Sequence, residues 1–147
     1  MNRFFAVPLT ALCCCVMFTD SRSLAADASE SDGVWKVAEA VLMGEPLPEQ
    51  IAKAITLTVK GEEYSVTIND AKEQDKGKVT IDAKASPKRM TIKSTFGPNN
   101  GKTLLAIYEM KDKDTMRVCY DITGKEFPKE FKSEKGENTY YVEYRRK

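Results

Sequence analysis

Side chains able to carry catalysis are scarce in this 147-residue chain. It contains no histidine, which removes the usual base that activates a serine or cysteine nucleophile and also the commonest metal ligand. Cys119 therefore has no histidine partner, and its place in an apolar strand predicts an inert, buried thiol. We predict that the protein is not an enzyme and that it uses no metal and no cofactor.

Carboxylates are the remaining candidates for chemistry, since a pair of them suffices for glycoside hydrolysis and several can bind calcium. The acidic clusters of this chain fall in turns or in the polar stretch 69–76, which is predicted as a connection, so solvated charge is the ordinary interpretation. None has the spacing of a twelve-residue calcium loop. The clusters are Glu62-Glu63, Asp70 with Glu73 and Asp75, and Asp112 with Asp114.

The segment from Gly97 to Thr103 ends in Gly-Lys-Thr, as a phosphate-binding loop does. Only three residues separate its two glycines, instead of four, and the segment lies between two predicted strands rather than before a helix. We interpret it as a hairpin loop, because it concentrates turn-forming residues.

The elements that would position any site are short strands. Alternating apolar and polar residues recur from Gly33 onward, with a bulge expected near Glu39-Ala40 and a short helix expected from Pro48 to Ala54. No segment of ten residues has a helical period. The pattern predicts a mainly β fold, an antiparallel up-and-down barrel of about eight strands with one short helix after the first. The predicted strands span residues 33–42, 55–59, 64–68, 77–82, 90–92, 104–110, 116–120 and 140–144.

Several of these strands carry aromatic and methionine side chains that can line a site for a small apolar ligand. The same residues are equally ordinary core, because eight-stranded barrels are often filled by their own side chains. Both interpretations remain open from the sequence. The candidate ligand-binding residues are Tyr64, Met90, Ala106, Tyr108, Met116 and Tyr120.

The first residues predict export to the periplasm or the outside of the cell. Arg3 precedes an apolar run over residues 9–18 that is too short to span a bilayer comfortably, as in a signal peptide. Small residues favour cleavage after Ala25, with cleavage after Ala26 as the second choice. A lipid anchor is not expected, because Leu12 precedes the first of the three neighbouring cysteines where a lipoprotein signal has a small residue.

Cleavage at residue 25 would leave a chain with equal numbers of basic and acidic side chains. Because the two signs are interspersed, no summed field attracts nucleic acid, and we predict no nucleic-acid partner. No transmembrane helix is predicted in the mature chain. We divide the sequence into a signal peptide at 1–25, a flexible lead-in at 26–32 and a barrel domain at 33–147.

Six motifs of the mature chain stand in a characteristic order: Gly33-Val34-Trp35-Lys36-Val37, Gly44-Glu45-Pro46-Leu47-Pro48, Gly77-Lys78-Val79-Thr80-Ile81-Asp82, Gly101-Lys102-Thr103-Leu104-Leu105-Ala106-Ile107-Tyr108-Glu109, Arg117-Val118-Cys119-Tyr120, and Pro128 with Phe131-Lys132-Ser133. They resemble the lipocalin-like small domain of unknown function that is abundant in exported proteins of planctomycete bacteria. The resemblance covers nearly all of the mature chain, although Phe127 stands where that pattern usually has an arginine. It implies a fold and a compartment, because that family has no established activity.

Lipocalins in general pair an early Gly-x-Trp with an arginine on the last strand, whose guanidinium lies across the indole and closes the barrel floor. The resemblance implies this role for Trp35. Arg146 is the candidate partner, since it shares a strand face with Tyr144, whereas Arg145 shares one with Glu143. The alternative is that Trp35 is simply core and that both arginines belong to a solvated tail.

Two functions are compatible with such a barrel. The first is a carrier that admits a small apolar ligand at the mouth of the barrel. The second is a cell-envelope interaction module without a small-molecule ligand, which binds another exported protein or a cell-wall component through loops or an exposed aromatic residue such as Tyr141. A deep cavity with a few polar groups would favour the carrier, and a contiguous exposed apolar patch would favour the interaction module.

Overall fold

The computed structural model describes residues 30–147, so the predicted signal peptide and residues 26–29 of the predicted lead-in lie outside the described residues. No helix in the described part of the chain is both long and apolar enough to cross a membrane. The elements, in chain order, are β1 (Gly33–Leu42), β2 (Glu45–Pro46), α2 (Glu49–Ala54), β3 (Ile55–Lys60), β4 (Glu63–Ile68), β5 (Glu73–Asp82), β6 (Lys88–Phe96), β7 (Thr103–Asp112), β8 (Thr115–Asp121) and β9 (Thr139–Arg146).

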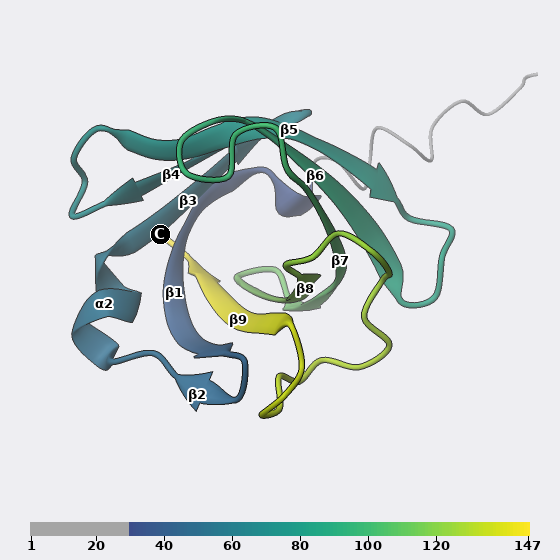
Figure 1. Ribbon diagram of the computed structural model, residues 1–147. Helices are drawn as coiled ribbons and strands as arrows, with labels where there is room; N and C mark the ends of the chain where they lie inside the picture. Colours follow the sequence, from purple (N-terminus) through teal and green to yellow (C-terminus); the bar gives the residue numbers. More distant parts are fainter. Residues whose placement is uncertain (1–29) are drawn as a thin grey trace, which may run out of the picture.

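Within residues 30–147, eight strands close into an antiparallel barrel around a central axis (Figure 1). The strands pair in the order β1-β3-β4-β5-β6-β7-β8-β9, and β9 returns to pair with β1. The two-residue β2 pairs with the end of β1, and the short helix α2 precedes β3. Closure pairs the first strand with the last, so the barrel has no long unpaired edge. The predicted mainly β, up-and-down barrel is confirmed.

The inner face of the barrel holds the apolar core, because side chains alternate in and out along each strand. Trp35 of β1, Ala106 of β7 and Val118 of β8 are fully buried on this face. The expected bulge in β1 is present: the register between β1 and β9 shifts between Val37 and Glu39. The extra residue keeps apolar side chains of both halves of β1 directed inward.

One strand begins earlier than the sequence predicts. β5 starts at Glu73, inside the polar stretch predicted as a connection, and Asp75 pairs with Val66 of β4. The turn before it is confined to the few residues around Asn69 and Asp70, both of which have positive φ. The start of β5 was not predictable from hydrophobic periodicity, because polar side chains there satisfy strand pairing without marking an apolar face.

The long connection between β8 and β9, residues 122–138, lies against the outer face of the barrel. Two of its aromatic rings contact arginines of the sheet. The guanidinium of Arg89 lies 4.6 Å from the ring centroid of Phe127, and that of Arg117 lies 4.2 Å from the ring centroid of Phe131. These cation–π contacts fix the connection to β6 and β8.

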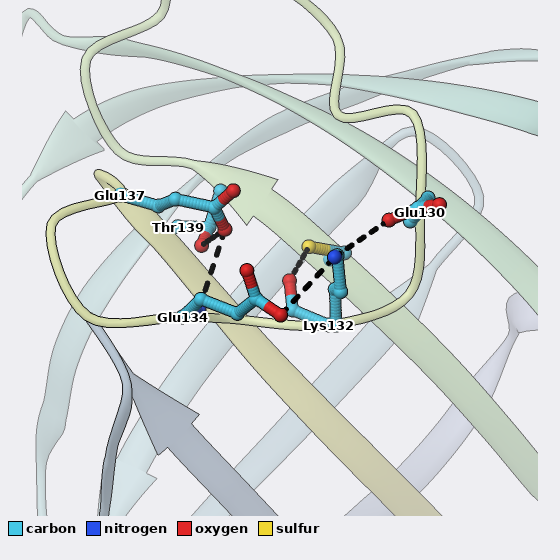
Figure 2. A network of polar contacts seen from close by, with 6 residues as sticks. Glu130, Lys132, Glu134, Glu137 and Thr139 are labelled. Carbon is cyan, nitrogen blue, oxygen red and sulfur yellow. Dashed lines mark hydrogen bonds and ion pairs between the residues drawn. The ribbon is translucent and has the colours of Figure 1, made fainter.

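Figure 2 shows the polar contacts around Lys132 in this connection. Its ammonium lies 2.9 Å from Glu130 and 3.1 Å from Glu134, and hydrogen bonds to these carboxylates raise the pKa of Lys132. The backbone carbonyl of Lys132 accepts a hydrogen bond of 3.2 Å from the Cys119 thiol. Cys119 points outward from β8 but is fully buried, and burial raises its pKa to about 11. The connection therefore creates a second buried layer outside the barrel.

Candidate functional site

The indole of Trp35 blocks one end of the barrel. The ring is fully buried, and its Nε1 donates a hydrogen bond of 2.9 Å to the carbonyl oxygen of Ser31, which is fully buried as well. Residues 30–32, the described part of the predicted lead-in, thus pack against this end. An indole is one of the largest apolar groups in a protein, so a single residue fills much of the cross-section here.

The guanidinium of Arg146 lies over this indole, with its central carbon 4.2 Å from the ring centroid. Its nitrogens also donate to backbone carbonyls: Nε to Lys113 at 3.0 Å, Nη1 to Asp32, and Nη2 to Glu30 at 3.1 Å. One side chain therefore connects β9, the β7–β8 turn and the segment before β1.

Steric contact explains why a glycine occupies position 33, close to the stacked side chains of Trp35 and Arg146. Its φ is +137°, a conformation that other residues rarely adopt. A Cβ atom at this position would lie 2.6 Å from Nη1 of Arg146. The glycine of the Gly-x-Trp motif therefore leaves the space that the guanidinium occupies.

The opposite end of the barrel opens into a cavity of about 510 Å³. This volume lies within the range of about 300–1,000 Å³ that is usual for small-molecule sites. Every barrel strand contributes at least one inward-facing side chain, and most of them are aliphatic or aromatic. The rim includes Leu42, Ile55, Leu104 and Tyr140, which lie at the strand ends remote from Trp35. The site is thus a pocket with one blocked end and one open end.

Four of the six predicted ligand-binding residues line this cavity, namely Tyr64, Met90, Met116 and Tyr120. The other two, Ala106 and Tyr108, are fully buried in the core and do not line it. Tyr140 and Tyr144 line the cavity as well but are absent from the prediction. Their alternation with Val142 in β9 was the signal that could have identified them.

Tyrosine hydroxyls supply much of the polarity inside the cavity. The hydroxyl oxygens of Tyr120 and Tyr144 are 3.1 Å apart and share a hydrogen bond. The rings of Tyr120 and Tyr140 stack with centroids 5.7 Å apart. Burial raises the pKa of Tyr140 to about 12 and raises the pKa values of Tyr120 and Tyr144 further, so all three are neutral at physiological pH.

Asp75 is the acidic residue of the cavity wall. Its Oδ1 accepts hydrogen bonds from the hydroxyls of Ser94 at 2.6 Å and Tyr64 at 3.2 Å. Its Oδ2 accepts one from the side-chain amide of Asn99 at 3.1 Å. The interpretation of Asp75 as a solvated loop charge is wrong, because the residue belongs to β5 and faces the cavity. The spacing of two from Asp75 to Gly77 and Val79 was the available sequence signal.

The other acidic side chains of these clusters are exposed at the surface. Asp70 lies 3.4 Å from the ammonium of Lys36, and Asp112 accepts a hydrogen bond of 2.8 Å from the backbone N–H of Asp114. Glu62 and Glu63 are exposed at the β3–β4 turn. No group of three or more cysteine or acidic side chains within residues 30–147 is arranged to hold a metal ion.

A second hollow, of about 580 Å³, lies among residues 121–139 on the outside of the barrel. Charged and polar side chains of the β8–β9 connection form most of its lining. Because its lining is more polar, it has less of the character of a small-molecule site than the cavity inside the barrel.

No protein-family model matches the chain, and no curated protein or solved structure is significantly similar to it. The family resemblance drawn from the sequence motifs therefore stays a prediction. The geometry itself shows a lipocalin-like barrel of eight antiparallel strands within residues 30–147, blocked at one end by Trp35 and open to a cavity at the other.

Proposed function

We propose that this barrel binds a small apolar ligand in its internal cavity. The observation that carries the proposal is the apolar cavity of about 510 Å³ inside a barrel whose other end is blocked. A barrel filled by its own side chains would contain no such space, since protein interiors are normally close-packed. Transfer of an apolar molecule from water to this wall is favourable by about 25 cal/mol for each Å² of apolar surface buried.

A few polar groups would orient the ligand. The hydroxyls of Tyr120 and Tyr144 and the carboxylate of Asp75 belong to an otherwise largely apolar lining. This combination is typical of small-molecule sites, in which apolar contact supplies affinity and a small number of polar atoms supply specificity.

Fluorescence titration of the mature chain with N-phenyl-1-naphthylamine, a neutral apolar probe, tests the proposal. We expect saturable binding to one site per chain. Val66→Trp should weaken binding by about tenfold or more, because Val66 lines the cavity and an indole there occupies the ligand's space. Thr67→Trp is the matched control, since Thr67 is the next residue of β4 and has its side chain on the outer face.

Native mass spectrometry of gently purified protein supplies a second test. A stoichiometric apolar adduct that Val66→Trp removes would support the proposal and identify the ligand class. A bare polypeptide mass together with no saturable probe binding would refute it, and so would equal probe affinity in both tryptophan variants.

We also propose that the protein is exported, as the family that it resembles is. The support is the Arg3-led apolar run over residues 9–18, followed by small residues at the predicted cleavage site. N-terminal sequencing of protein recovered from the periplasm or medium should find Ala26 or Asp27 as the first residue. Intact Met1 on protein retained in the cytoplasm would contradict export.

Contact with another exported protein is a second candidate function, favoured by exposed apolar side chains around the open end. They are Leu42 at the end of β1, Met43 after it, Ile51 in α2, Ile68 at the end of β4 and Phe96 at the end of β6. A photo-crosslinking residue at position 51 should then give a specific adduct in the exporting cell. The same residue at position 34, an exposed apolar site at the blocked end, is the control. Equal labelling from both positions would refute a specific contact.

A further inference from the structure

The carboxylate of Asp75 is held rigidly although it lines a mostly apolar cavity. Three neutral donors bind it: the hydroxyls of Tyr64 and Ser94 and the side-chain amide of Asn99. They come from β4, from β6 and from the β6–β7 loop, so three separate parts of the chain converge on one acidic group. Ser94 is itself buried. An acidic group supported in this way has a fixed direction toward the cavity rather than a mobile position in solvent.

No lysine or arginine within residues 30–147 forms an ion pair with this carboxylate. The neighbouring Lys76 pairs instead with Glu73, at 3.1 Å. Lys102, the basic residue of the cavity lining, is exposed to solvent and lies beyond ion-pair distance of Asp75. The negative charge of Asp75 is therefore not neutralised by any cation in the described part of the chain.

The carboxylate also retains hydrogen-bonding capacity. Its two oxygens can accept about four hydrogen bonds between them. Oδ1 accepts two and Oδ2 accepts one, so one acceptor position remains on Oδ2. A charged acceptor with a free position beside an apolar wall is suited to a cationic donor on an apolar molecule.

We propose that Asp75 is a specificity-determining residue that selects amphiphiles with a primary ammonium head. In this arrangement the apolar chain occupies the cavity and an ammonium N–H donates to Oδ2 of Asp75. A chain of equal length ending in a carboxylate is disfavoured, because it brings a like charge toward Asp75. The inference rests on the proposed function, since it needs an apolar ligand in the cavity.

Displacement of N-phenyl-1-naphthylamine by three amphiphiles of equal chain length tests this inference. At pH 7 and below their micelle concentrations, dodecylamine is cationic, dodecanol is neutral and dodecanoate is anionic. We expect dodecylamine to bind the wild-type protein about tenfold or more tightly than dodecanoate, with dodecanol between them. Asp75→Asn should reduce the ratio of the amine and carboxylate affinities to about one.

Asp82→Asn is the matched control, because Asp82 is an exposed residue at the far end of the same strand, where it accepts a hydrogen bond from the backbone of Lys84. It should leave the preference intact. Asn99→Ala provides a second variant should Asp75→Asn fail to fold. It removes one neutral donor but keeps the charge, so the preference for the amine should persist.

The outcomes separate this inference from the proposed function. Probe binding with equal affinity for the amine and the carboxylate would overturn the role of Asp75 and leave the carrier function standing. A preference for dodecanoate that Lys102→Met abolishes would also overturn it and would assign head-group recognition to Lys102. Absence of all probe and amphiphile binding would overturn the carrier function and, with it, this inference.

Discussion

Arg146 joins parts of the chain that are remote in sequence. Its guanidinium contacts the indole of Trp35 and donates hydrogen bonds to backbone carbonyls of residues 30, 32 and 113. Replacing Arg146 removes the stacking and the hydrogen bonds together, so the loss of stability in a single variant does not measure the stacking alone.

A double-mutant cycle isolates the contact between Trp35 and Arg146. We expect Trp35→Ala to lower the free energy of unfolding by about 3–5 kcal/mol, because the indole is fully buried. The coupling free energy with Arg146→Ala should be about 0.5–2 kcal/mol in urea unfolding experiments. Arg145→Ala, at a largely exposed side chain, is the control and should change stability little. Additive losses would mean that stacking contributes nothing.

Cys119 is predicted to resist thiol reagents in the folded protein. It is fully buried beneath the β8–β9 connection, and its raised pKa of about 11 leaves almost no thiolate at pH 8. Reaction with 5,5′-dithiobis(2-nitrobenzoic acid) should therefore be slow in buffer and fast in concentrated urea. Rapid stoichiometric labelling of the native protein would contradict this burial.

At the scale of elements, the β8–β9 connection depends on Asp121, where it leaves the sheet. The Asp121 carboxylate accepts hydrogen bonds from the backbone and hydroxyl of Thr123 and from the backbone N–H groups of Lys125 and Glu126. Burial alone would raise the pKa of Asp121, but these donors lower it below its usual value. The first turn of the connection is thus organised around one negative charge.

Asp121→Asn should therefore loosen the connection. We expect a loss of about 1–3 kcal/mol in the free energy of unfolding near neutral pH and faster reaction of Cys119 with thiol reagents. Asp82→Asn, which affects an exposed turn with one backbone donor, should change neither quantity appreciably. Unchanged thiol reactivity in Asp121→Asn would show that other contacts hold the connection.

The contribution of the Asp121 carboxylate to stability has a defined pH dependence. Because the pKa of Asp121 is lowered in the folded state, its contribution is present above the unfolded pKa of about 3.9. The contribution is lost as the pH falls through the folded value. The stability difference between the wild type and Asp121→Asn should accordingly shrink in acid, as measured by urea unfolding at a series of pH values. A constant difference down to pH values well below about 3.9 would contradict this assignment.

For the whole molecule, the cavity tyrosines predict sensitivity to alkali. Burial raises the pKa values of Tyr64 and Tyr140 to about 12 and raises those of Tyr120 and Tyr144 further. In the unfolded chain tyrosine ionises near pH 10, so above that pH the unfolded state binds fewer protons than the folded state. The stabilising contribution is therefore complete below about pH 10 and is lost as the pH rises toward 12 and beyond.

We expect the free energy of unfolding to fall by about 2 kcal/mol or more between pH 8 and pH 10.5. Urea unfolding measures the loss, and absorbance at about 295 nm follows tyrosinate formation directly. Cys119→Ala is the control that removes the contribution of the thiol, whose pKa is also raised. An unchanged urea midpoint at the higher pH would mean that the cavity tyrosines ionise freely in the folded barrel.

The features of this protein that depend on local sequence were predictable. Alternation along β3, β4 and β8 identified strands and the side chains that share a face, since a period of two directs side chains to the same side, but it left open which face points inward. It failed at Asp75, whose strand is polar where it begins, and it did not separate Ala106, which is packed core, from Met90, which lines the cavity. Both side chains point into the barrel. Whether each one lines the cavity depends on how closely side chains of the other strands pack beside it.

The sequence by itself determined the mainly β architecture and which side chains of each clearly alternating strand share a face, because side-chain alternation and turn formation are local properties. Only the tertiary structure decided that the barrel contains a cavity and that Asp75 faces it. Free internal volume depends on how side chains from eight strands fill a common space, and the surroundings of Asp75 are assembled from separate strands and a loop. Such properties belong to packing, which no single segment of the chain specifies.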